Sequence, residues 1–131
     1  MKQTLALIFI LGFNLTIFAQ TQTEMNIESN ERFKSTDQEL NEVYQLILED
    51  YQTDTLFIEK LKASQRLWIK FRDSELEMKY PESDKRLYGS MYPMCATAYL
   101  DQLTNDRIKK LKEWLEPIPK GEGCVGSVKY R

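Results

Sequence analysis

Apolar side chains recur every three to four residues along most of this chain, the spacing typical of amphipathic helices. The pattern predicts one helix over residues 24–50, a second over 55–79 and a third from Ser90 to about Pro117. No strand alternation of any length and no internal repeat interrupts it. Short turns between three helices favour an all-α fold, an antiparallel bundle of three main helices with a short C-terminal tail.

Capping residues set the expected helix ends. Thr21 and Glu24 have the spacing of a capping box, which predicts the start of the first helix. Asp54 can cap the second helix, and Pro81 ends it because proline lacks the needed N–H. Ser90 is the expected cap of the third helix, with Pro93 in its first turn.

The segment 65–73 forms the middle of the second helix and contains Trp68, the most hydrophobic anchor of the chain. We expect one stripe of this helix to face the core, made of Leu61, Ser64, Trp68, Phe71 and Leu76. Gln65, Arg72 and Asp73 are expected beside that stripe. The bulk of the core is predicted to come from Phe33, Phe57, Trp68, Phe71 and Trp114.

The first residues resemble a secretory signal. Lys2 provides a short basic start, the run from Leu5 to Phe18 is mostly apolar, and Ala19 is a small residue at the expected cleavage point. We therefore predict a signal peptide at 1–19, a helical domain at 20–119, a tail at 120–131 and a secreted or periplasmic protein. The alternative is an uncleaved membrane anchor; after cleavage we expect none.

Charge is distributed unevenly along the chain. Residues 20–59 carry ten acids and two bases, a net charge of −8, whereas residues 60–131 carry ten acids and fifteen bases, a net charge of +5. The two halves could attract each other within one bundle, or the acidic face could meet a basic partner. The bases are interleaved with acids, which disfavours a nucleic-acid partner.

Two cysteines and no histidine limit the chemistry. In an oxidising compartment Cys95 and Cys124 could form a disulfide that ties the glycine-rich tail to the third helix, or they could remain two thiols. Without histidine, no convincing zinc site or Cys–His catalytic pair is present. We expect neither a metal nor any other cofactor.

Three sequence motifs together resemble those of one known family. They are Thr21–Asn26 with Asp37–Tyr44, then Ala63–Asp73, and finally Gly89–Met94 with Leu103–Arg107 and Leu111. In this order and spacing the chain resembles the lysozyme inhibitor LprI N-terminal domain family, small secreted helical proteins of bacterial envelopes, over residues 22–115. Members commonly carry cysteine where this chain has Glu28, Leu76 and Tyr99, so the resemblance does not transfer their disulfides.

Seven polar motif residues come from all three predicted helices: Asp37, Asn41, Gln65, Arg72, Asp73, Thr104 and Arg107. If their faces converge, the arginines can donate to the carboxylates while the amides satisfy the remaining groups, and this network would fix how the helices align. The alternative makes Asp37 and Asp73 a carboxylate pair for glycoside cleavage. The chain offers no histidine, metal set or evident cleft, so we predict no catalytic residue and no enzyme.

The loop between the second and third helices holds the residues that we expect to contact a partner: Tyr80, Glu82, Asp84, Tyr88 and Tyr92. The resemblance implies a secreted, non-enzymatic protein that binds lysozyme, whose cleft this loop could enter while the acidic half attracts the basic enzyme. The alternative is an envelope structural or interaction domain with another protein partner. The sequence predicts no oligomeric state.

Overall fold

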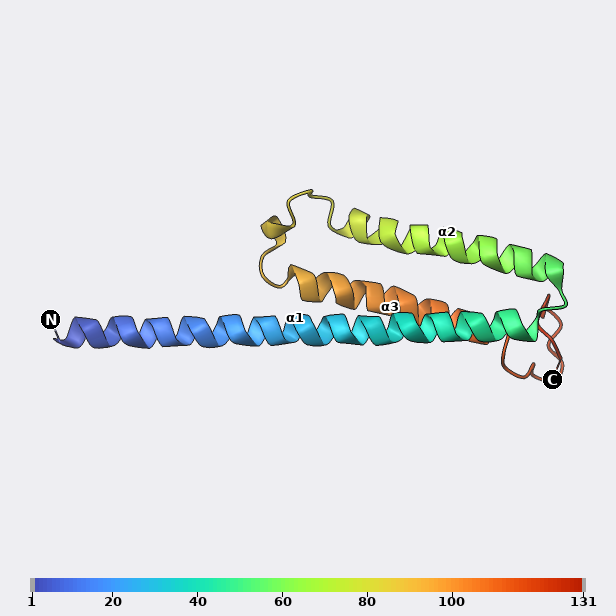
Figure 1. The fold of residues 1–131 in the computed structure, drawn as a ribbon, viewed down its shortest axis with the longest axis horizontal. Coiled ribbons are helices and arrows are strands. Elements are labelled where there is room, and N and C mark those ends of the chain that lie inside the picture. Colours follow the sequence, from blue (N-terminus) through green and yellow to red (C-terminus); the bar gives the residue numbers. More distant parts are fainter. Residues whose placement is uncertain (1, 131) are drawn as a thin grey trace.

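A computed structural model describes residues 2–130, with side chains described from residue 21 to residue 130. Three long helices, α1 (Lys2–Asp50), α2 (Thr55–Lys79) and α3 (Tyr92–Lys112), and the short 3-10 helix η1 (Lys85–Tyr88) make up its regular structure (Figure 1). No strand occurs among the described residues, which confirms the all-helical prediction. The chain runs up, down and up, so α1 and α3 point the same way and α2 runs against both.

The tightest packing in the molecule lies between α1 and α3, which are side by side in Figure 1. A row of apolar side chains on α1, three to four residues apart, faces α3 and forms a continuous core with it. This core contains Leu40, Val43, Ile47, Tyr51, Leu61, Ile108 and Leu111. Full burial of one such aliphatic side chain stabilises the fold by about 1.5–3 kcal/mol, so this seam is the main source of stability.

The start of α1 differs from the prediction. The helix begins at Lys2, so Thr21 and Glu24 lie within it and do not form a capping box at its start. No proline or paired glycine precedes residue 24 to end a helix, which is why the helical pattern continues upstream. The predicted signal sequence at 1–19 and its cleavage point concern side chains outside the described residues.

The bounds of α2 agree with the prediction because Asp54 accepts from the Phe57 N–H at the start and Pro81 follows its end. The predicted inner stripe was wrong in two members, however. Ser64 and Phe71 are exposed, whereas Gln65 is buried and the Arg72 side chain is only 14% exposed. The polar pair occupies the inner face because partners on α1 and α3 satisfy it.

The third helix is shorter at its end than predicted. It runs from Tyr92 to Lys112, well before Pro117, and Trp114 and Leu115 continue in a turn. Pro93 does lie in its first turn, as predicted, but the cap position is Met91 rather than Ser90. The Ser90 carbonyl instead accepts from the Asn26 side chain of α1.

The C-terminal tail closes one end of the bundle without forming a helix or strand over its described residues. The Tyr51 hydroxyl donates to the Trp114 carbonyl at 3.0 Å and accepts from the Lys129 N–H at 2.9 Å. The Trp114 indole donates to the Ser127 hydroxyl at 2.9 Å. The tail is therefore held by buried Tyr51 and by Trp114, and not by a disulfide.

The disulfide that we considered between Cys95 and Cys124 is not formed; both residues are free thiols. Cys95 lies in the first turn of α3, whereas Cys124 lines a hollow with Trp114 beyond the other end of that helix. At 1.5 Å per residue, the helix from Cys95 to its end at Lys112 is about 25 Å long. A disulfide needs Cα atoms within about 7 Å, so these two residues cannot pair within one chain.

Candidate functional site

The motif residues meet around the indole of Trp68, where α2 faces α1 and α3. The guanidinium of Arg72 lies 5.4 Å from the centre of this ring, and that of Arg107 lies 5.8 Å from it. Arg72 also lies 5.9 Å from the Phe33 ring of α1. We call Asp37, Gln65, Trp68, Arg72 and Arg107 the Trp68 cluster. Cation–π contacts of this kind are worth about 0.5–2 kcal/mol, and more where water is excluded.

Arg72 connects α2 to α1 within this cluster. Its Nε donates to Asp73 at 2.9 Å, and its Nη1 donates to Asp37 of α1 at 3.4 Å. Both carboxylates are about half exposed, while the arginine side chain is nearly covered. A covered guanidinium needs such acceptors, since an unpaired buried charge is costly. The ion pair therefore fixes the approach of α2 to α1.

Arg107 makes the matching connection between α3 and α2. Its Nε donates to the Gln65 side-chain oxygen at 3.0 Å, and its Nη2 donates to the Ser64 hydroxyl at 3.2 Å. Burial lowers the pKa of Arg107 from its ordinary value, because removal from water disfavours the charged form. Ser64, which we expected in an apolar stripe, therefore takes part in the hydrogen bonds between α2 and α3. Its position next to Gln65 in the sequence was the one sign of this role.

Two of the predicted network residues lie elsewhere. Asn41 donates to the Asp37 carbonyl within α1, and Thr104 donates to the Leu100 carbonyl within α3. Thr104 is fully buried, which lets the two helices approach closely while its hydroxyl remains satisfied inside its own helix. The structure therefore brings five of the seven residues together, with Asp73 at the edge of the cluster.

The hydrolase alternative required Asp37 and Asp73 to act as a pair of catalytic carboxylates. Asp37 and Asp73 both accept hydrogen bonds from the one guanidinium of Arg72, at 3.4 and 2.9 Å. Among the residues whose side chains are described, no three histidine, cysteine or acidic groups are close enough to hold a metal ion. The hydrogen bonds of this cluster run between α2 and α1 and between α3 and α2.

The loop tyrosines pack on one another. Tyr80 meets the rings of Tyr88 and Tyr92 edge-on, each with centroids 5.1 Å apart, and Tyr88 stacks on Tyr92 at 5.7 Å. The Tyr88 hydroxyl accepts from the Glu82 N–H, and the Lys85 ammonium donates to the Tyr80 carbonyl. Burial, with a smaller effect of nearby Cys95, raises the pKa of Tyr80. The three rings therefore form a small core that shapes the loop.

The exposed part of this loop is charged. Asp84 caps η1 by accepting from the Arg86 N–H, and its carboxylate also accepts twice from the Arg86 guanidinium at 2.8 Å. These hydrogen bonds lower the pKa of Asp84, although both groups are exposed. Glu82 and Leu87 project from the same turn. A partner at this end would meet Glu82, Asp84, Arg86 and Leu87 before the tyrosine rings.

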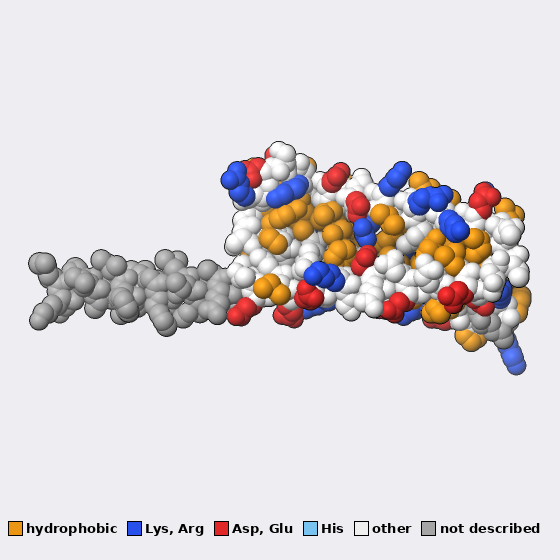
Figure 2. Space-filling model, viewed as in Figure 1, with side chains coloured by type: hydrophobic (Ala, Val, Ile, Leu, Met, Phe, Trp, Pro, Cys, Tyr) orange, Lys and Arg blue, Asp and Glu red, His pale blue; other side chains and the backbone are white. Residues whose placement is uncertain are grey.

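The outer face of α1 carries a row of exposed acidic side chains, of which Glu28 and Glu31 are ion-paired with Arg32 and Lys34 at 3.0 and 2.8 Å. We call it the acidic ridge; its members are the exposed residues Glu24, Glu28, Glu31, Glu42 and Glu49. Figure 2 shows acidic side chains spaced along the lower part of the molecule, and Lys and Arg side chains with acidic ones among them on α2. A shallow groove follows part of the ridge, lined by Lys34, Asp37, Gln38, Asn41, Glu42, Gln45, Leu46 and Glu49. At 1.5 Å per residue the ridge extends about 37 Å.

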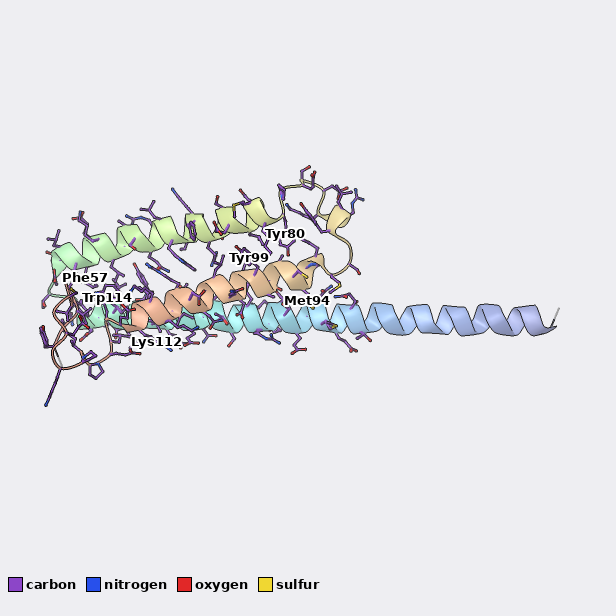
Figure 3. All side chains as sticks on the ribbon, turned by 180° about the vertical axis from the view of Figure 1, so that it is seen from behind. Phe57, Tyr80, Met94, Tyr99, Lys112 and Trp114 are labelled. Carbon is purple, nitrogen blue, oxygen red and sulfur yellow. The ribbon has the colours of Figure 1, made fainter. Side chains whose placement is uncertain are left out.

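A further contact between α2 and α3 was not predicted. The Tyr99 hydroxyl of α3 donates to Glu75 at 3.1 Å, and the Lys79 ammonium lies 3.8 Å from the Tyr99 ring. Burial and the Glu75 hydrogen bond raise the pKa of Tyr99. Figure 3 places Tyr99 between these two helices, toward the loop end. Tyr99 and Leu76 were two of the positions where similar proteins carry cysteine, and Glu75 and Lys79 flank Leu76 in the same part of α2.

Comparison with known proteins identifies the family. Residues 17–111 match the family described as lysozyme inhibitor LprI, a span that contains all of the Trp68 cluster. The chain is 33% identical over 109 residues to the uncharacterized protein R02472 of Rhizobium meliloti (strain 1021), covering 75% of this chain and 76% of that protein. No solved structure matches the chain. The chain belongs to the lysozyme inhibitor LprI family.

Proposed function

We propose that this chain is a secreted or periplasmic, non-enzymatic protein that binds a lysozyme and inhibits it. The family is associated with secreted or periplasmic inhibitors, and among the described side chains no helix is long and apolar enough to cross a membrane. The observation that carries the proposal is the acidic ridge, five exposed glutamates on one face of α1. A surface of this sign attracts a basic enzyme and raises the rate of encounter.

The inhibited complex would use two surfaces. The acidic ridge complements the positive surface of the enzyme, and the loop between α2 and α3 enters the substrate cleft. The packed rings of Tyr80, Tyr88 and Tyr92 support this role, because a preorganised loop loses little conformational freedom on binding. The charged tip at Glu82 and Asp84 is the part that would reach cleft groups first.

A lysozyme assay tests this proposal. The purified protein is titrated against several lysozymes, and the clearing of a suspension of bacterial cell walls is followed at low and at moderate salt. We expect inhibition that saturates near one inhibitor per enzyme and weakens as salt screens the ridge. Absence of inhibition at every ratio and salt concentration would remove the proposal, and inhibition that ignores salt would remove the part assigned to the ridge.

A further inference from the structure

The outer face of α2 carries apolar side chains where a helix of a small bundle normally carries polar ones. Leu56, Leu67, Phe71 and Met78 are 65%, 66%, 53% and 68% exposed. Together with Ala63 they follow one another by steps of seven, four, four and seven residues, so they share one side of the helix. Isolated exposed apolar residues are ordinary, but an aligned row of them marks a contact surface.

The row faces away from the bundle because the Trp68 cluster occupies the opposite side. Gln65, Trp68 and Arg72 point inward, where they bind Arg107 and Asp37. Rotating α2 to bury Leu67 and Phe71 would expose Trp68 and break both arginine contacts. The exposed row is therefore fixed by the fold, not by a loose helix.

Basic side chains lie along the same stretch of α2 as the middle of this row. Lys60, Lys62, Arg66 and Lys70 are all exposed, and no acid occurs between Lys60 and Phe71. A shallow hollow there is lined by Ala63, Arg66, Leu67, Ile69 and Lys70. We call the row and these four cations the α2 patch. Lys60 is ion-paired with Glu59 at 3.1 Å, which leaves the patch a local charge of +3 from Lys62, Arg66 and Lys70 beside its apolar contact area. A counterpart that is both apolar and anionic matches this combination.

We propose that the α2 patch binds the surface of a membrane that contains anionic lipids. An apolar row flanked by lysine and arginine is the pattern of helices that lie in the headgroup region with their apolar side toward the acyl chains. The patch is one convex helix surface, which suits a planar, deformable surface. Each basic residue near such a surface adds attraction to anionic headgroups, and this attraction is screened by salt.

A second copy of the chain fits this patch less well. A symmetric contact would use the same patch on both copies. Pairing two α2 helices about Leu67 would bring the cations around Leu67 of one copy close to those of the other. Like charges across an interface oppose association, whereas anionic headgroups neutralise them. The proposal does not depend on lysozyme inhibition, since the acidic ridge lies on α1.

Vesicle co-sedimentation tests the proposal, using the chain as the producing cell processes it, with its N-terminus read by mass spectrometry. We expect binding to vesicles that contain phosphatidylglycerol, at least tenfold weaker binding to pure phosphatidylcholine, and a further loss at about 0.5 M salt. The double variant Leu67→Ser, Phe71→Ser should weaken binding to the anionic vesicles at least tenfold. Arg66→Gln with Lys70→Gln should weaken it and reduce its salt dependence.

The matched control is Leu46→Ser on α1, which removes an apolar side chain that is 52% exposed but lies outside the patch. It should change binding less than twofold, and circular dichroism checks that each variant is folded. Three outcomes overturn the proposal: no vesicle binding, equal binding to neutral vesicles, or binding that survives loss of Leu67 and Phe71. Concentration-dependent dimers in sedimentation velocity that the double variant abolishes would assign the patch to a second copy instead.

Discussion

The two outer helices, α1 and α2, differ in which side chains they turn toward the core and which toward solvent. α1 buries an apolar row that includes Leu40 and Ile47 against α3 and shows acids to solvent. α2 turns Gln65 and Arg72 inward and shows Leu67 and Phe71 to solvent. A helix can therefore be positioned by a few specific polar contacts when its neighbours supply the partners, and its apolar side then remains available for another surface.

The apolar seam between α1 and α3 and the polar seam formed by the Trp68 cluster should therefore contribute differently to the free energy of folding. Apolar burial between α1 and α3 is non-directional and proportional to area, so it supplies most of the free energy of folding. The contacts of the Trp68 cluster need correct distances and angles, and their net stabilisation is smaller because water is replaced as a partner. We infer that the first seam holds the bundle together and the second sets the position of α2.

The largest expected effect comes from the apolar seam. Ile47→Ala should lower the free energy of unfolding by about 2–5 kcal/mol, because Ile47 is fully buried and the change leaves a cavity. Denaturant titration followed by circular dichroism measures it. The matched substitution Leu46→Ala, one residue along on the exposed side, should stay within about 0.5 kcal/mol. Equal effects at the two positions would contradict the position assigned to the core.

The next effect tests the polar seam. Arg72→Met keeps contact with Trp68 but removes the donors to Asp37 and Asp73, so we expect a loss of about 1–2 kcal/mol in a melting experiment. The loss is limited because both carboxylates are half exposed and regain water. A double-mutant cycle with Asp37→Asn should give coupling below about 1 kcal/mol. An unchanged melting temperature would show that this seam does not stabilise the fold.

A third prediction concerns the end of the bundle, where the tail meets Tyr51 and Trp114. Tyr51→Phe removes a buried hydroxyl that links the Trp114 carbonyl to the Lys129 N–H, and should cost about 1–2 kcal/mol. The tail should also become more sensitive to limited trypsin digestion after Lys120. Tyr130→Phe, at an exposed tyrosine in the same tail, is the control and should digest as the unchanged protein does. Unaltered digestion of the Tyr51 variant would mean that other contacts hold the tail.

The smallest expected effect lies in the loop. Arg86 lowers the pKa of Asp84, so this contact stabilises the folded loop at pH values above the ordinary range of an aspartate and is lost as the pH falls through the lowered pKa. An NMR titration of the Asp84 carboxyl should show it ionising at a higher pH in Arg86→Gln. Identical titrations in the two proteins would rule out the pair. Because both groups are exposed, the melting temperature should change little.

The sequence predicted the helices well and the faces of α2 poorly. Asp54 and Pro81 act through neighbouring backbone groups, so the bounds of α2 could be predicted locally. The orientation of α2 could not, because two rows near Trp68 repeat with helical spacing: one contains Phe71, the other Gln65 and Arg72. Choosing between them requires knowing that Arg107, some forty residues later, lies opposite Gln65.

The candidate site, too, could be predicted from the sequence only in part. Grouping Asp37, Gln65, Arg72 and Arg107 followed from motif residues on three helices, and the structure brings these four together. Asn41 and Thr104 share those motifs but bond within their own helices, a choice that small polar side chains make from local geometry. The packing of the three loop tyrosines on one another was not predicted, because nothing in the local sequence shows that the rings will meet.

The functional account rests most directly on the acidic ridge of α1, and one binding measurement separates it from the rest of the surface. The triple variant Glu31→Gln, Glu42→Gln, Glu49→Gln is compared with Glu77→Gln, Asp106→Asn, Glu116→Gln, which removes the same charge from exposed residues off α1. In calorimetric titration of a basic lysozyme at low salt, we predict that the first triple weakens binding at least tenfold and the second less than about twofold. Equal weakening by the two triples, or none by the first, would contradict the account.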